Sequence, residues 1–486
     1  MDKNLKALKP ALVWKHFAEI CNIPHPSHSE DAIRAYIVKW AEELGLEHKI
    51  DEAQNVYVYK PATPGMEDRK GIILQAHTDM VPQKNNDKVF DFETDPIEAY
   101  IDGEWVTANG TTLGADNGIG VAAAMAALED DELVHGPLEA LFTATEETGM
   151  DGAFGLQGGM LKGEILLNLD SETEGELYVG CAGGLDANIT FKYKEQPLEG
   201  KFAAYRVTVK GLKGGHSGIQ IGYQRANANK VMNALLLKAT EEYDARVADI
   251  QGGSLRNAIP RESFVTITVP EAKAEELVAY VPVFEAAVKE EFAAVEPEMS
   301  ITIVPAEMPA KVIDKQTIAN LIEAVAKYPN GVIAMSKDFE GTVETSSNLA
   351  IVKLVDGQIM TASLQRSLVD ASKDELAAEM RKVLESCGAR AESTGSYPGW
   401  KPNINSIIYN TMKKVYADKY GKTPKTMVIH AGLECGILGS KYPNWDMVSF
   451  GPTLVFPHSP DEALKIDTVP LFWDFLVETL KNVPVK

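Results

Sequence analysis

The pattern of apolar and polar residues changes twice along the chain. Up to about residue 185, short continuous apolar runs end in polar residues, and this pattern is typical of buried strands. Apolar residues at helical spacing predict helices between the runs. The predicted helices cover 8–22 and 29–44, with a third after Gly120, and the predicted strands cover 55–60, 71–77, 138–144 and 165–169. Strands that each end in polar residues predict an α/β sheet with a site at the carboxyl ends of its strands.

After about residue 185, single apolar and polar residues alternate, which predicts amphipathic strands. Helical segments lie between them, so we expect an α+β domain. It has two related sets of elements, although no sequence repeat is evident. The predicted strands cover 187–192, 205–210, 263–269, 300–304, 342–354 and 358–367, and the predicted helices cover 226–242, 272–291, 315–326 and 373–385.

The α/β style returns from Tyr397 onward, where helices are predicted at 404–416 and 469–481 and a strand at 426–430. A length of 486 residues exceeds one ordinary core, so two or more domains are expected. The sequence therefore predicts a catalytic domain in two parts, interrupted by an insertion. The predicted boundaries are 1–186 and 396–486 for the catalytic domain and 187–395 for the inserted domain.

Charge and cysteine usage narrow the function. A net charge of -23 disfavours binding to nucleic acid or to an anionic membrane, because like charges repel. The chain has no apolar run of about 18 residues, so no transmembrane helix is expected. The N-terminal 20 residues resemble an amphipathic helix more than a signal peptide. Four scattered cysteines do not form a disulfide pattern, and a cytoplasmic location is expected.

The stretch 71–82, GIILQAHTDMVP, joins an apolar strand to a His and an Asp. His77 and Asp79 are two residues apart, so their side chains point to the same side of the strand. A carboxylate beside an imidazole is the usual arrangement that orients a metal-bound His. The alternative is a surface strand end with two polar residues, and this short motif does not exclude it.

Four further residues that can bind metal follow apolar runs or a glycine-rich turn. Each alone has a simpler explanation as a turn, surface or loop residue. Their joint occurrence with His77 at one sheet edge predicts a metal centre. Two His and three carboxylates, one of them bridging, supply three contacts to each of two ions and leave one position open. The four residues are Asp116, Glu147, Asp170 and His458.

This mixture of ligands suits two divalent metal ions, with zinc favoured and manganese or cobalt tolerated. The pKa of a water molecule bound between such ions falls toward about 7. A free carboxylate nearby can then take its proton. Glu146, next to the ligand Glu147, is the natural candidate.

The same residues lie in motifs that resemble the di-zinc exopeptidases related to aminoacylase and carboxypeptidase G. The motifs are HTDMV, LGADNGIG, ATEETGMDG, NLDSE, GGHSG and RNAIP, followed by a late His. HAGLECG at 430–436 and LQRS at 364–367 are similar to a branch of bacterial dipeptidases. The resemblance covers nearly the full length. It implies an α/β zinc-exopeptidase catalytic domain, with a mixed sheet and helices on both faces, interrupted by an inserted α+β lid domain.

The resemblance also implies ligand roles. Asp116 would bridge the two metals, His77 and Asp170 would complete one ion, and Glu147 and His458 would complete the other. The peptide bond after Asp116 would be cis.

The remaining catalytic roles are likewise implied by the resemblance. Asp79 would orient His77, and Glu146 would act as general base and acid. In the inserted domain, His216 of GGHSG would stabilise the tetrahedral oxyanion. Without the resemblance, GGHSG would be interpreted as a simple turn.

Residues for the two ends of the substrate come from the same comparison. Asn257 of RNAIP and Arg366 of LQRS resemble residues that bind the substrate backbone and its terminal carboxylate, which an Arg can hold through two hydrogen bonds. Glu434, together with His430, could receive a free amino group. Fixing both ends in this way implies a dipeptidase.

The predicted function is hydrolysis of unblocked dipeptides, of the Xaa-His type and others, through a water that bridges two metals. The alternatives are an N-acyl amino-acid deacylase, a tripeptidase, or an inactive metal-binding protein. Glu434 favours the dipeptidase, because a free amine needs a carboxylate and an acyl cap does not. In relatives with a small lid, the lid His acts across a homodimer. The long insertion here allows His216 to act within its own chain, so both arrangements stay open.

Overall fold

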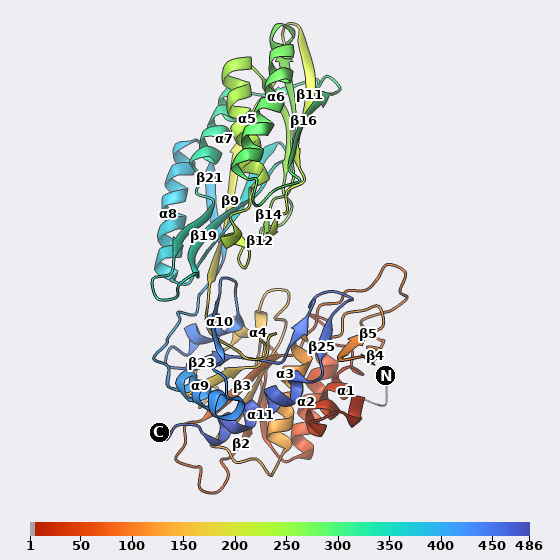
Figure 1. Ribbon diagram of the computed structural model, residues 1–486, viewed down its shortest axis with the longest axis vertical. Coiled ribbons are helices and arrows are strands. Elements are labelled where there is room, and N and C mark those ends of the chain that lie inside the picture. The colour runs from red at the N-terminus through yellow and green to blue at the C-terminus, as the bar shows by residue number, and fades with distance from the viewer. Residues whose placement is uncertain (1–4) are drawn as a thin grey trace. The chain divides into compact units, whose positions relative to one another are not determined.

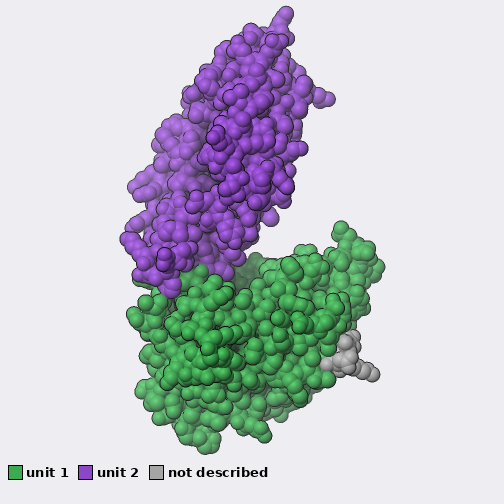
Figure 2. All heavy atoms as spheres, viewed as in Figure 1, with its two compact units in different colours: residues 1–180, 400–428, 433–486 green, residues 181–399, 429–432 purple. Residues whose placement is uncertain are grey.

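The computed structural model describes residues 5–486 and divides the chain into two compact units (Figure 2). Within the described residues, unit 1 comprises 5–180, Trp400–Val428 and Leu433–Lys486, and unit 2 comprises Cys181–Gly399 and Ile429–Gly432. The insertion thus begins and ends several residues outside the predicted 187–395. Its first and last strands extend to Gly183 and Tyr397, where glycines and polar residues interrupt the alternation.

The centre of unit 1 is an eight-stranded sheet in the order β1-β2-β6-β3-β7-β23-β8-β22 (Figure 1). Its inner strands β6, β3, β7 and β23 are parallel to one another, whereas β1, β2 and β8 pair antiparallel, so the sheet is mixed. The strands are β1 (Glu47–Ile50), β2 (Val56–Lys60), β3 (Ile72–His77), β6 (Leu138–Thr143), β7 (Ile165–Asn168), β8 (Glu176–Cys181), β22 (Lys425–Ile429) and β23 (Asp446–Ser449).

Every residue of β3, β6 and β7 is buried, which shows that both faces of the sheet are covered. Helix α3 packs on β3 and against α1, and α9 packs on β23 and against α11. The helices are α1 (Ala11–Ile20), α2 (Asp31–Glu43), α3 (Ala115–Glu129), α4 (Asp151–Gly155), α9 (Ile407–Tyr420), α10 (Glu434–Lys441) and α11 (Thr468–Lys481).

A smaller sheet in unit 1 combines two strands from residues 99–108 with two strands from residues 454–465. Its strand order is β24-β25-β5-β4. It contains the antiparallel hairpin of β4 and β5, and its C-terminal strands flank the loop of His458. The strands are β4 (Ala99–Asp102), β5 (Trp105–Ala108), β24 (Leu454–Val455) and β25 (Ala463–Lys465).

Unit 2 is a nine-stranded sheet with helices α5 to α8 along one side (Figure 1). Apolar residues from those helices and from the strands form one core. The strands of this sheet are β9 (Gly183–Lys192), β11 (Phe202–Lys210), β13 (Arg246–Gly252), β15 (Ser263–Pro270), β16 (Ser300–Pro305), β18 (Gly331–Met335), β19 (Val343–Val355), β20 (Gln358–Ser367) and β21 (Arg390–Tyr397). The helices are α5 (Ala228–Tyr243), α6 (Glu271–Glu291), α7 (Lys315–Lys327) and α8 (Asp370–Ser386).

Eight strands of the sheet form two copies of one β-α-β-β-α-β arrangement, and the ninth, β18, pairs with β19 outside both copies. One copy runs β11, α5, β13, β15, α6, β16, and its strands lie in the order β16-β11-β15-β13. The other runs β9, α7, β19, β20, α8, β21, and its strands lie in the equivalent order β21-β9-β20-β19. The copies join where β13 pairs antiparallel with β19. The pattern predicted two related sets of elements, one after the other, with the second beginning at the strand 300–304. The structure has two copies of one topology, but they are nested: β9 belongs to the later copy and β16 to the earlier one.

The sequence prediction missed several elements and misplaced the start of the first helix. The elements that were not predicted include β1, β8, β13, β18, β21 and α10, which are short or lack a long periodic apolar pattern. The N-terminal helix begins only at Ala11, and the first four residues of the predicted amphipathic segment lie outside the described residues. Within 5–486, no helix combines the length and apolarity needed to cross a membrane.

Candidate active site

Three loops at the carboxyl ends of parallel strands bring the predicted ligands of unit 1 together. His77 ends β3, the Glu146–Glu147 pair follows β6, and Asp170 follows β7. Asp116 lies at the start of α3. Two of the groups that could hold a metal ion are His77, Asp116 and Asp170, and Asp116, Glu147 and His458. In each of these groups the potential ligand atoms all lie within 4.8 Å of one another.

Asp116 is common to both groups. Its Oδ1 lies 3.1 Å from His77 Nε2, and its Oδ2 lies 3.2 Å from His458 Nε2. His77 Nε2 is also 3.4 Å from Asp170 Oδ1, and His458 Nε2 is 2.9 Å from Glu147 Oε2. Each oxygen of one carboxylate thus faces a different His, as expected of a ligand shared by two ions.

The glycine-rich turn explains how Asp116 reaches this position. Gly114 has φ +71°, a left-handed conformation that glycine adopts without steric cost. A Cβ on Gly120 would lie 2.6 Å from the carbonyl oxygen of Leu169, so only glycine lets α3 approach the end of β7. The peptide bond between Asp116 and Asn117 is cis, as the resemblance implied.

Asp79 holds both the imidazole of His77 and the turn after β6. Its Oδ1 is 3.4 Å from His77 Nδ1 and accepts the backbone N–H of Glu146 at 2.8 Å. Its Oδ2 accepts the backbone N–H of Glu147 at 3.1 Å and the hydroxyl of Ser27 at 2.8 Å. Burial opposes ionisation, but the interactions with His77 and the Glu146 amide lower the pKa of Asp79 to about 2. A charged carboxylate therefore fixes one ligand and the neighbouring Glu146 together.

Glu462 was not predicted from the sequence, although it ends the segment GPTLVFPHSPDE, which also contains His458. Its buried carboxylate accepts four consecutive backbone N–H groups, from Leu113 to Asp116, at 2.8 to 3.2 Å. It thereby ties the turn of Asp116 to the loop of His458, four residues before it. The only signal in the sequence was one acidic residue among several in a polar loop.

The residues of this cluster fit divalent cations. Glu147 Oε1 and Asp170 Oδ1 are buried and have no hydrogen-bond partner among the described residues. Burial raises the pKa of Asp170 to about 6 and raises that of Glu146 well above its usual range. The acids of this cluster outnumber its two imidazoles, the buried His77 and the exposed His458, and metal ions would supply the missing positive charge. Glu146 lies beside the cluster, with Oε2 4.0 Å from His77 Nε2.

Glu434 lies at the first residue of α10, next to the centre of the sheet. Gln75 Nε2 donates to its Oε2 at 2.6 Å, and Thr143 Oγ1 donates to the same oxygen at 2.9 Å. Asn168 Nδ2 binds Gln75 Oε1, so the orientation of the Gln75 amide is set. Glu434 Oε1 is buried without a partner among the described residues. One oxygen is thus fixed and the other is left for a ligand. Gln75, a polar residue inside an apolar strand, was the signal overlooked in the sequence.

The other predicted residues lie in unit 2. His216 is in the short strand β12 (Gly215–His216), which pairs with β14 (Ala258–Ile259). Its Nδ1 accepts the backbone N–H groups of Gly218 at 3.2 Å and Ile219 at 3.1 Å. The ring proton therefore resides on Nε2. Burial, reinforced by the charge of Arg366, lowers the pKa of His216 to about 4, so its imidazole is neutral near pH 7.

Arg366, His430 and Asn257 complete the residues of unit 2. Arg366 is buried in β20, and its Nη1 donates to the Tyr397 hydroxyl at 2.6 Å. His430 Nε2 is 2.7 Å from Ser346 Oγ. Asn257 is exposed, and its backbone carbonyl accepts the N–H of Ser217 at 2.8 Å beside His216. Among the predicted site residues, unit 2 thus carries His216, Asn257, Arg366 and His430. Unit 1 carries the candidate metal ligands together with Asp79, Glu146 and Glu434.

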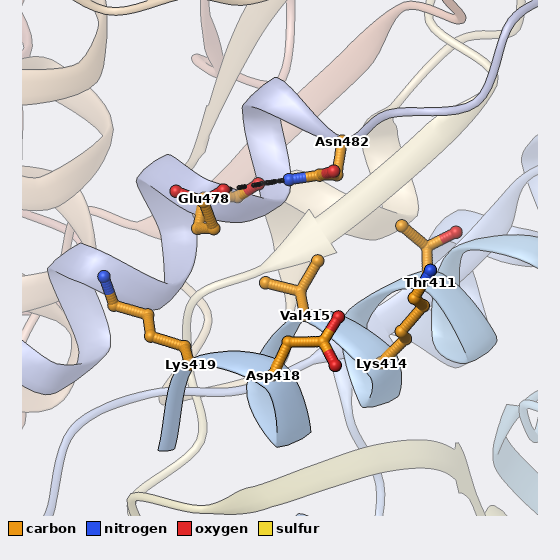
Figure 3. Close-up of a pocket in the computed structure, with 7 residues that line it drawn as sticks. All are labelled: Thr411, Lys414, Val415, Asp418, Lys419, Glu478 and Asn482. Atoms are coloured by element: carbon orange, nitrogen blue, oxygen red, sulfur yellow. Dashed lines mark hydrogen bonds between the residues drawn. The ribbon is translucent and has the colours of Figure 1, made fainter. Parts of the chain in front are cut away.

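A separate hollow on unit 1 contains none of these residues. It lies between α9 and α11 and has a volume of about 490 Å³. Figure 3 shows that Asn482 donates to Glu478 across its edge, so these groups already satisfy one another. The residues that line it are Thr411, Lys414, Val415, Asp418, Lys419, Glu478 and Asn482. This surface offers no candidate chemistry.

Comparison with known proteins agrees with this geometry. Residues 73–482 match the family described as peptidase family M20/M25/M40. The chain is 47% identical over 482 residues to the cytosol non-specific dipeptidase of Escherichia coli, covering 99% of each. The crystal structure of aminoacylhistidine dipeptidase from Vibrio alginolyticus matches with a TM-score of 0.92 and 48% identity, covering 99% of this chain and 98% of that one.

A tripeptidase structure from Staphylococcus aureus matches with a TM-score of 0.57 at 16% identity, covering 98% of this chain and 99% of that one, and this likeness shows the fold alone. The resemblance stated from the motifs is confirmed, including its dipeptidase branch. The chain belongs to the peptidase family M20/M25/M40.

Proposed function

We propose that this chain is a metal-dependent dipeptidase that hydrolyses unblocked dipeptides. The observation that carries the proposal is the arrangement around Asp116, whose two oxygens face two different His residues, each with a further carboxylate. The relatives near half identity are named as dipeptidases, one non-specific and one for aminoacylhistidine substrates. The first is named for the cytosol, in agreement with the location predicted here.

Two divalent ions bound in unit 1 would polarise the scissile carbonyl and lower the pKa of a bound water toward about 7. His77, Asp116 and Asp170 would hold one ion, and Asp116, Glu147 and His458 the other. Zinc suits this ligand set best, and manganese or cobalt can also be bound by it. Asp79 keeps His77 oriented, because it binds the ring nitrogen that faces away from Asp116.

Glu146 is the residue that moves the proton. As a general base it accepts a proton from the attacking water, and as a general acid it returns that proton to the leaving amine. Asp79 anchors its backbone, and the next residue, Glu147, is a proposed ligand, so Glu146 is held beside the cluster.

His216 stabilises the oxyanion of the tetrahedral intermediate. Because Nδ1 is occupied by two backbone N–H groups, Nε2–H is the group that the ring offers. A neutral donor whose orientation is set by its own loop needs little reorganisation when the negative charge develops.

Residues at the two ends of the substrate define its length. Arg366 binds the terminal carboxylate, Asn257 binds the peptide backbone, and Glu434 Oε1 receives the free amino group. His430 Nε2 is already bonded to Ser346, so this residue contributes through Nδ1. Groups that bind both ends favour a dipeptide over a longer peptide.

The test is hydrolysis of a dipeptide panel by protein stripped with a chelator and reloaded with zinc, manganese or cobalt. The panel includes Xaa-His dipeptides, N-acetylated counterparts and tripeptides. We expect metal-dependent release of amino acids from free dipeptides, with capped substrates inert. Cleavage restricted to capped substrates would favour a deacylase, cleavage restricted to tripeptides a tripeptidase, and metal binding without turnover an inactive protein.

We also propose that His216 acts within its own chain. Unit 2 carries two copies of one lid topology, which supports a lid that is complete without a partner. A mixture of His216→Ala and Glu146→Gln chains, refolded together, tests this proposal. No recovery of activity is expected, whereas recovery toward about a quarter of wild type, the most that random pairing allows, would show that His216 acts across a homodimer.

A further inference from the structure

Arg366 is a buried cation without an acidic partner. Arg366 is only 5% exposed, and its Nε has no hydrogen-bond partner among the described residues. The carboxylate of Asp186 lies nearby in the neighbouring strand but is 3.6 Å from Arg256, with which it forms an ion pair. Within residues 5–486 no acid lies at ion-pair distance from Arg366. A buried guanidinium in this state requires an anion.

Tyr397 reaches this guanidinium across a row of three strands. The register of β20, β9 and β21 places Arg366 opposite Gly184, and Gly184 opposite Tyr397. The Tyr397 ring lies over Gly184, where any Cβ would collide with it. Because Gly184 has no side chain, the Tyr397 hydroxyl can reach Arg366 Nη1, at 2.6 Å.

The backbone of Tyr397 is anchored from a second direction. Lys373, which is 2% exposed, donates to the Tyr397 carbonyl at 2.9 Å and to Asp370 Oδ1 at 3.0 Å. The same Asp370 oxygen accepts the N–H of Gly399 at 3.0 Å. The phenol is thus held in place before any ligand arrives.

We infer that Tyr397 is part of the site that binds the substrate's terminal carboxylate, together with Arg366. This inference rests on the proposed role of Arg366 and extends it to a residue that no motif indicated. The hydroxyl accepts a hydrogen bond from Arg366 Nη1 and so restricts the plane of the guanidinium. The Nε–H group takes no part in this bond and is left for a ligand. The hydroxyl's own hydrogen can then be donated to a carboxylate oxygen of the substrate beside Arg366. Charge-assisted hydrogen bonds of this kind are about twice as strong as neutral ones.

The experiment compares dipeptides that end in a free carboxylate with the same dipeptides as C-terminal amides. The readout is the ratio of kcat/KM for acid to amide, measured for metal-loaded enzyme. Tyr397→Phe should raise KM for the acid and lower the ratio roughly tenfold, while kcat changes less. Gly184→Ala should shift the ratio in the same direction, because the added methyl displaces the ring without removing its hydroxyl.

Tyr328→Phe is the matched control. Tyr328 is also a buried tyrosine of unit 2, and its hydroxyl binds Ser363 and Gln365 instead of Arg366. Its loss should leave the ratio unchanged. An unchanged ratio in Tyr397→Phe, with the ratio of Arg366→Ala reduced, would overturn this inference alone. If Arg366→Ala also leaves the ratio unchanged, the proposed carboxylate role of Arg366 fails as well.

Discussion

The two units carry clusters of opposite charge. In unit 1, acids gather around two imidazoles, and burial raises the pKa of Glu146 and Asp170. In unit 2, burial and Arg366 lower the pKa of His216 to about 4 and of His430 to about 3. One cluster therefore lacks positive charge and the other lacks negative charge. Neither is satisfied by its own residues, which points to ligands: cations for the first and a carboxylate for the second.

The comparison also separates two ways of holding a functional side chain. In unit 1 the ligands are fixed by other carboxylates, Asp79 and Glu462, which accept backbone N–H groups. In unit 2 the side chains are fixed by neutral groups, namely the amides around His216 and the hydroxyl of Tyr397. An acidic support in unit 2 would neutralise Arg366 and remove its capacity to bind an anion. The predictions below test this contrast.

The largest effect is expected at Glu146. Glu146→Gln removes the group that accepts the proton but keeps its shape, so kcat should fall by about 10²- to 10⁴-fold. Metal content, measured by elemental analysis, should remain at the wild-type level because the proposed ligands are intact. Full activity in this variant would show that another residue transfers the proton. The proposed division in unit 1 between metal ligands and a separate base, Glu146, would then be wrong.

A smaller loss of kcat is expected at His216. His216→Ala removes the neutral donor, and deletion of one oxyanion donor typically costs about 10²- to 10³-fold in kcat. KM and the unfolding midpoint should change little, as measured by steady-state kinetics and thermal denaturation. Unchanged kcat would reduce GGHSG to a turn and leave unit 2 with only a substrate-binding role.

Glu462→Gln should weaken metal binding without removing any proposed ligand. Its amide cannot match the charge that four N–H groups of the Asp116 turn now bind, so metal affinity should fall about 10- to 100-fold. Chelator competition measures this change, and Asp461→Asn, at the exposed neighbouring acid, is the control. Equal affinities in both variants would show that Glu462 supports the fold only.

The smallest effect concerns the protonation of His216. Above about pH 4 its imidazole is neutral, and it becomes protonated as the pH falls through that value. Arg366→Gln removes a neighbouring positive charge, which favours the protonated form, so the pKa should rise toward the ordinary 6.5 but stay below it, since burial remains the larger cause. Nitrogen NMR of the labelled imidazole follows the titration. A pKa that does not move would show that Arg366 does not influence this ring.

The sequence by itself determined which residues could form the site of unit 1. His77, Asp116, Glu147, Asp170 and His458 each follow an apolar run or a glycine-rich turn, and parallel strands bring their carboxyl ends to one edge of the sheet. The change from continuous apolar runs to alternation likewise predicted an insertion at 187–395, and unit 2 comprises 181–399 and 429–432. Period and local turn chemistry are properties of neighbouring residues, so they can be recognised in the chain alone.

Only the tertiary structure revealed the supporting residues. Glu462 contacts a turn 346 to 349 residues away, and Gln75 contacts Glu434 across 359 residues. Tyr397 reaches Arg366 only because strand register sets Gly184 between them. Such contacts depend on strand order and on side-chain packing between distant segments. They leave no periodic signal, and for that reason their residues look like ordinary polar positions in the sequence.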